Sequence, residues 1–225
     1  MKKLNEIFDK IFSFLPGYAF GLLVFSTGML GAILALILSP EYIMWEKSIS
    51  VLGHQTGGVY LRIGLIISGL IAIPFFVYLG RKVKHESVNE YLRKAAIFAG
   101  IFSMLSVTFS GIFSGVNEFI STIHGMFALF GWLSGTVFCF LFSIIMLINP
   151  KFTKIQVYIG FLITGIFIYY LIPFFITNFC DYYQNICYEF GRKVYIIIPI
   201  SEWMVYFATL IWFLFNSSYM LYKKI

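Results

Sequence analysis

The chain contains few charged residues: Asp, Glu, Lys and Arg make up 12% of its 225 residues, whereas 60% are apolar and 20% are aromatic. This balance excludes a soluble globular domain and is typical of a helical membrane protein. The sequence also lacks a glycine-rich phosphate loop, an HExxH pattern and a CxxC pair. Because these common signatures are absent, no motif points directly to an activity.

Six apolar runs are each long enough to cross a hydrocarbon core of about 30 Å, which takes about 20 residues. Their approximate bounds are 17–39, 63–80, 95–115, 123–148, 155–177 and 194–222. The sequence therefore predicts an all-α polytopic membrane protein, a bundle of six transmembrane helices. We expect one integral membrane domain over residues 1–225, with no separate soluble domain.

Residues 1–16 precede the first run and are amphipathic. Apolar residues recur at helical spacing from Leu4 to Leu15, with charged and polar residues between them, until Pro16 interrupts the pattern. We expect a short helix that lies in the membrane interface. A cleaved signal peptide is disfavoured, because the apolar run that follows is too long for the core of such a peptide.

Basic residues are unevenly divided among the predicted loops. If both termini are cytoplasmic, the outer segments hold Lys47, Arg62, Arg192 and Lys193, which leaves 12 of the 16 basic residues in cytoplasmic segments. Cytoplasmic loops carry the excess of Lys and Arg, so we predict a multi-pass protein of the cell membrane with both termini inside. The net charge of +6 reflects this topology and favours contact with membrane lipids; it gives no reason to expect nucleic acid.

The sequence has only three cysteines. Cys180 and Cys187 fall in the predicted outer segment between the fifth and sixth runs, where disulfides persist, so we predict that they are bridged. Two free thiols remain the alternative, since closeness in sequence does not ensure a geometry that can be bridged. Cys139 lies within the fourth run.

A carboxylate, Glu202, lies inside the last apolar run. Burying an ionised side chain in hydrocarbon costs at least about 2.5 kcal/mol, so an acid at this depth marks a candidate functional site and needs a partner. The candidate partners lie near the ends of runs that meet the same membrane face; they are Ser50, His54, Glu118 and His124.

We predict that Glu202 and His124 meet in a polar pocket open to the outer side, with Ser50 or Glu118 as a third wall. Tyr206, one helical turn after Glu202, is predicted to donate a hydrogen bond to it. The four His and Glu candidates have no spacing diagnostic of zinc, so we expect no metal and no cofactor. Close helix packing is expected at three glycine pairs: Gly17 with Gly21, Gly111 with Gly115, and Gly131 with Gly135.

Three features together resemble a known family. The motif SVLG at 50–53, the histidine His124 that opens the fourth run and the glutamate Glu202 near the start of the sixth are similar to the prokaryotic six-helix membrane family called domain of unknown function 998. That family is distantly related to the DRAM and Frag-type membrane proteins. The chain departs from the family pattern at Val51 and at Trp203, whose ring we expect to face the interface. The resemblance implies a helical bundle with a polar cluster at the outer leaflet and supplies no reaction.

Three kinds of function stay open. The first is a non-enzymatic membrane protein whose polar cluster holds the bundle together or binds a lipid head group. The second is an intramembrane hydrolase or lipid-modifying enzyme with Ser50 as nucleophile, His124 as base and Glu202 as orienting carboxylate. The third alternative is a small-solute or proton-coupled transporter. Whether the chain is an enzyme, and whether it forms a homo-oligomer, the sequence leaves open.

Overall fold

The computed structural model describes residues 2–115, 117–182 and 184–224, and within these ranges it is all α-helical, with no strand. The helices are α1 (Lys2–Phe14), α2 (Gly17–Ile37), α3 (Ile49–Leu52), α4 (Gly58–Lys82), α5 (Glu90–Ile112), α6 (Glu118–Ile148), α7 (Lys154–Tyr182), α8 (Gln184–Tyr195) and α9 (Ile198–Lys223). The helices long and apolar enough to cross a membrane are α2, α4, α5, α6, α7 and α9. The predicted six-helix fold class is confirmed, and the chain is a multi-pass membrane protein.

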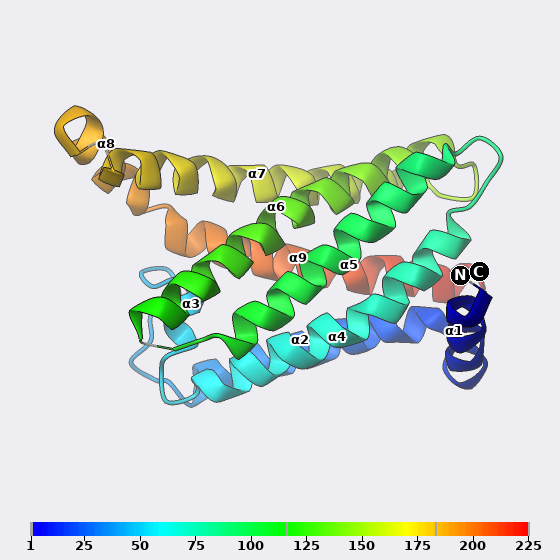
Figure 1. Ribbon diagram of the computed structural model, residues 1–225, viewed down its shortest axis with the longest axis horizontal. Helices are drawn as coiled ribbons and strands as arrows, with labels where there is room; N and C mark the ends of the chain where they lie inside the picture. Colours follow the sequence, from blue (N-terminus) through cyan, green and yellow to red (C-terminus); the bar gives the residue numbers. More distant parts are fainter. Residues whose placement is uncertain (1, 116, 183, 225) are drawn as a thin grey trace.

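The bundle has two distinct ends (Figure 1). Both chain termini and α1 lie at one end, which we call the terminal end, and α3 and α8 lie at the other, which we call the loop end. Each long helix packs against the next one in the chain, except that α9 packs against both α7 and α2. The six long helices therefore form a closed ring around a common interior.

Aromatic side chains fill the interior on the side of the terminal end. Phe76, Phe138, Phe142, Trp212 and Phe213 are at most 1% exposed. The ring centroid of Phe76 lies 5.0–6.0 Å from those of the other four. Aromatic pairs at such distances add to the stabilisation that burial alone provides. This half of the bundle is a packed core.

The first helix is joined to α4 by polar and aromatic contacts. Arg81 forms an ion pair with Asp9 at 2.5 Å. Phe12 packs its ring against Phe20 and Tyr78. The predicted N-terminal helix is thus present, and one of its apolar residues is covered by the bundle.

The start of the last spanning helix differs from the prediction. The sixth apolar run was expected from residue 194, but Val194 and Tyr195 belong to α8, and α9 begins at Ile198. Pro199 stands in the first turn of α9, where proline is tolerated because the first backbone N–H groups of a helix have no partner within the helix. Hydropathy does not register this break, since the residues on both sides of it are apolar.

Candidate functional site

A cavity of about 500 Å³ lies at the loop end, bounded by α6, α7, α8 and α9 and by the segment around α3. We call it the mouth cavity. Its lining combines aromatic rings with polar and charged groups: Ser48, Ser50, His124, Tyr170, Asn178, Asp181, Tyr188, Arg192, Tyr195 and Glu202. The structure thus brings three sequence-derived candidates, Ser50, His124 and Glu202, around one space.

Two smaller cavities lie in the bundle, and each shares lining residues with the cavity before it. An inner cavity of about 50 Å³ shares Ser50, His124, Ala128 and Glu202 with the mouth cavity. A deep cavity of about 40 Å³ shares Leu65, Val107, Trp132 and Tyr206 with the inner cavity and reaches Phe213. The cavities therefore become narrower and more apolar with depth, and they stop at the aromatic core.

Glu202 is 6% exposed and lies against the start of α3. The Ser48 hydroxyl and the backbone N–H groups of Ile49 and Ser50 face its carboxylate. The first N–H groups of a helix have no partner within the helix, and a carboxylate near them is stabilised by the helix dipole. Glu202 therefore caps α3 from another helix and holds the loop that carries Ser50 against α9.

Next to Glu202, Trp203 anchors the same loop. Its indole Nε1 donates a hydrogen bond of 2.9 Å to the hydroxyl of Tyr42, which itself donates towards the carbonyl oxygens of Lys47 at 2.6 Å and Ser48 at 2.8 Å. Burial raises the pKa of the Tyr42 hydroxyl to about 12. Trp203 is 1% exposed, so the prediction that its ring faces the interface is wrong. The ring can be buried because the hydroxyl of Tyr42 on the loop accepts the hydrogen bond of the indole N–H.

His124 is oriented by the end of α5. Its Nδ1 lies 2.9 Å from the carbonyl oxygen of Ser110 and 3.2 Å from the hydroxyl of the same residue. A carbonyl only accepts, so this contact assigns the proton to Nδ1 and leaves Nε2 available to a ligand. The ring lines both the mouth cavity and the inner cavity.

The three candidates of the hydrolase hypothesis do not form a relay. The Ser50 hydroxyl pairs with that of Ser48 at 2.8 Å, His124 bonds to Ser110, and Glu202 faces the start of α3. In the described part of the chain, no hydrogen bond joins the side chains of any two of Ser50, His124 and Glu202; Glu202 meets Ser50 only through its backbone N–H. A serine nucleophile needs a base within hydrogen-bond reach, so the geometry supports a shared binding surface better than acyl transfer.

The other predicted residues lie around the cavities in different ways. Glu118 is exposed in the first turn of α6 and lines none of the three cavities. His54 is exposed beside the inner cavity; partial burial, together with the charges of His124 and Arg62, lowers its pKa. Tyr206 lines the inner cavity, but its hydroxyl donates to the carbonyl oxygen of Gly28 at 2.7 Å, so the predicted bond to Glu202 is not made.

Arg62, predicted from the sequence only as part of an outer loop, is also a lining residue. It is the fifth residue of α4 and lines the inner cavity. Its Nη1 donates to the carbonyl oxygen of Ser114 at 3.2 Å, and its Nε is buried without a hydrogen-bond partner. Its position just before an apolar run is the sequence feature that could have indicated a role at the cavity.

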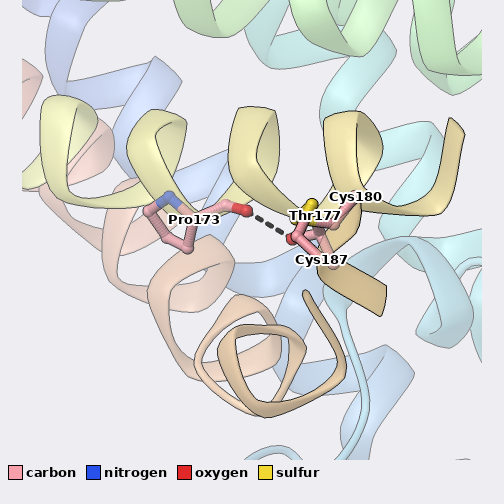
Figure 2. The surroundings of a disulfide bond; sticks show 4 residues. All are labelled: Pro173, Thr177, Cys180 and Cys187. Carbon is pink, nitrogen blue, oxygen red and sulfur yellow. Dashed lines mark hydrogen bonds between the residues drawn. A yellow bond between two sulfur atoms is a disulfide. The ribbon is translucent and has the colours of Figure 1, made fainter. Parts of the chain in front are cut away.

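The disulfide between Cys180 and Cys187 joins the end of α7 to α8 beside the mouth cavity (Figure 2). The backbone of α8 leaves helical geometry at Cys187. One turn before Cys180 on α7, Thr177 donates its hydroxyl to the carbonyl oxygen of Pro173. Gly191 of α8 packs closely against Cys180, and a Cβ added to this glycine would lie only 2.7 Å from the Cys180 Cβ. The crosslink therefore fixes the helix that forms one wall of the cavity.

Among the described residues, no group of three His, Cys, Asp or Glu side chains is arranged to hold a metal ion. Comparisons with known proteins give no further assignment: no protein-family model, no curated protein and no solved structure matches this chain. The resemblance to the six-helix family of unknown function stays a prediction.

Proposed function

We propose that this protein binds a membrane amphiphile, with the polar head group where the mouth and inner cavities adjoin and the first part of an acyl chain towards the deep cavity. The observation that carries the proposal is the shared lining: a polar space of about 500 Å³ adjoins narrower, more apolar spaces across Ser50, His124 and Glu202. Pockets for small ligands commonly measure about 300–1,000 Å³ and combine apolar walls with a few convergent polar groups.

The same cavities argue against the two other kinds of function. Ser50, His124 and Glu202 are each bonded elsewhere, so no activated nucleophile is assembled. The deep cavity is bounded by Phe213, which belongs to the aromatic core on the side of the terminal end. Cavities bounded by a packed aromatic core suit a binding pocket better than a transport path.

The amphiphile enters from the outer leaflet in this proposal, because the excess of basic residues favours a cytoplasmic terminal end. Reporter fusions test this orientation. Fusions at Lys84 and Lys151 are expected to report a cytoplasmic position, and fusions at His54 and Asn117 an external one. The reverse pattern would place the mouth cavity in the inner leaflet.

Fluorescence quenching tests binding in the cavities. Trp132 lines the inner and deep cavities, and bromine on an acyl chain quenches a nearby indole. Titration of the detergent-purified protein with bromine-labelled dioctanoylglycerol is expected to give saturable quenching. Trp132→Phe is expected to lose the saturable component and to keep only the linear background from exposed Trp45, which is 67% exposed. Quenching that does not saturate, or that is unchanged in Trp132→Phe, would contradict the proposal.

A further inference from the structure

We propose that the pocket selects a ligand that carries a phosphate group, and that Arg62 and His124 bind this group. The inference rests on the proposed binding function and specifies its ligand. It assigns a role to a charged side chain, Arg62, that the fold itself does not explain.

Arg62 carries a charge that the described part of the protein does not neutralise. None of the ion pairs formed by described residues includes Arg62, although it lies within the spanning helix α4. A guanidinium has five N–H donors, and the described residues use Arg62 for one hydrogen bond, to Ser114. Charged residues at membrane depth are costly and usually face a partner or a polar cavity. A ligand anion in the inner cavity would supply the missing counter-charge.

His124 is held beside Arg62 by the same end of α5. Arg62 donates to the carbonyl of Ser114, and His124 donates to the carbonyl of Ser110, four residues earlier. Ser110 lies in the last turn of α5 and Ser114 two residues after its end, and both line the inner cavity, so the two contacts keep both side chains at one wall of it.

Other charges near the cavity are compatible with an anion. Arg62 and His124 both contribute, after partial burial, to lowering the pKa of His54, so the three side chains lie near one another. Glu202 lines the same cavity, but the Ser48 hydroxyl and the N–H groups at the start of α3 already face its carboxylate. Arginine binds phosphate with paired N–H donors and with its charge, whereas the carbonyl groups of a neutral lipid supply no counter-charge.

A matched pair of ligands tests the inference. Dioctanoyl phosphatidic acid and dioctanoylglycerol differ only by the phosphate group, and each competes with bromine-labelled dioctanoylglycerol for quenching of Trp132. We expect wild-type protein to bind the phosphatidic acid at least about tenfold more tightly. Arg62→Gln is expected to remove this preference, and saturable quenching by bromine-labelled dioctanoylglycerol in the variant shows that it is folded.

Control variants separate phosphate recognition from net charge. Arg81→Gln removes the same charge at the terminal end, where Arg81 pairs with Asp9, and is expected to keep the preference. Arg62→Lys keeps the charge without the paired donors and is expected to retain only part of it. His124→Gln is expected to weaken binding of the phosphatidic acid more than binding of dioctanoylglycerol.

The outcomes distinguish this inference from the proposed function. Equal affinity of wild-type protein for the two lipids would overturn phosphate selection and leave amphiphile binding intact. No saturable binding of either lipid would overturn both. Inorganic phosphate that displaces the probe as well as the phosphatidic acid does, and only when Arg62 is present, would support the phosphate site and identify free phosphate as its ligand.

Discussion

The hydroxyl of Tyr42 joins the loop that carries Ser50 to α9, and its removal tests how that wall of the mouth cavity is held. The hydroxyl accepts a hydrogen bond from Trp203 and donates towards the carbonyls of Lys47 and Ser48. Tyr42→Phe deletes these contacts with little change in shape. It leaves the indole N–H of Trp203, a residue that is 1% exposed, without a partner.

The expected loss follows from two contributions. A hydrogen bond contributes about 1 kcal/mol net, and a buried donor left without a partner costs about 1–3 kcal/mol. We therefore expect Tyr42→Phe to lower the free energy of unfolding by about 2–4 kcal/mol. Tyr60→Phe is the matched control, because Tyr60 is 41% exposed, and its free energy of unfolding is expected to change by less than about 0.5 kcal/mol.

A double-mutant cycle with Trp203→Phe tests the cause. The double variant Tyr42→Phe/Trp203→Phe has no orphaned indole N–H, so its loss is expected to be smaller than the sum of the two single losses. Unfolding of the purified protein in detergent by increasing SDS provides the free energies. The reasoning would be refuted if Tyr42→Phe were as stable as Tyr60→Phe, or if the losses were strictly additive.

The remaining predictions concern three other parts of the fold. Gly31→Ala is expected to destabilise the protein by about 1–3 kcal/mol, because the added Cβ would lie 2.8 Å from the Tyr60 carbonyl oxygen and 2.9 Å from the Cα of Gly64; Gly125→Ala, where no atom lies within 4 Å, is the control. Partial burial lowers the pKa of His54, so the unfolded chain binds this proton more readily and stability falls as the pH decreases below about 6.5. The midpoint of unfolding is therefore expected to fall less with decreasing pH in His54→Gln than in the wild-type protein. Mass spectrometry of the unreduced, alkylated protein is expected to show the Cys180–Cys187 crosslink, and its removal by Cys187→Ser is expected to cost about 2–3 kcal/mol.

Each of these predictions has a clear contrary result. Equal stability of Gly31→Ala and Gly125→Ala would show that α2 and α4 are not in close backbone contact at this point. The same acid dependence in wild type and His54→Gln would assign the proton uptake to another group. Quantitative alkylation of both thiols before reduction would exclude the crosslink.

The spanning helices could be predicted because their signal is local. A continuous apolar run is enough to indicate a transmembrane helix, and the six runs correspond to α2, α4, α5, α6, α7 and α9. The close backbone contact between α2 and α4 at Gly31 and Gly64 could not be predicted in the same way. Neither glycine belongs to an expected pair, because which helices become neighbours is decided by the whole bundle.

The candidate site was predicted in its residue types and only partly in its contacts. The cost of burying Glu202 indicated correctly that it needs polar partners, but these partners are backbone groups of α3, and a helix of four residues leaves little trace in a sequence. Tyr206 and Trp203 turn to Gly28 and Tyr42, residues more than 150 positions away. Pairings at that separation depend on tertiary packing and cannot be read from local spacing.

Photo-crosslinking tests most directly whether the mouth cavity binds an amphiphile. A dioctanoyl phosphatidic acid with a diazirine near the head group labels the side chains around it, and mass spectrometry locates the adducts. The account predicts adducts on α7 at Tyr170 and Phe174, which line the mouth cavity, and their loss when unlabelled lipid is added in excess. Adducts confined to Ile172 and Phe175, which are 55% and 48% exposed on the same helix, with no effect of the competitor, would contradict it.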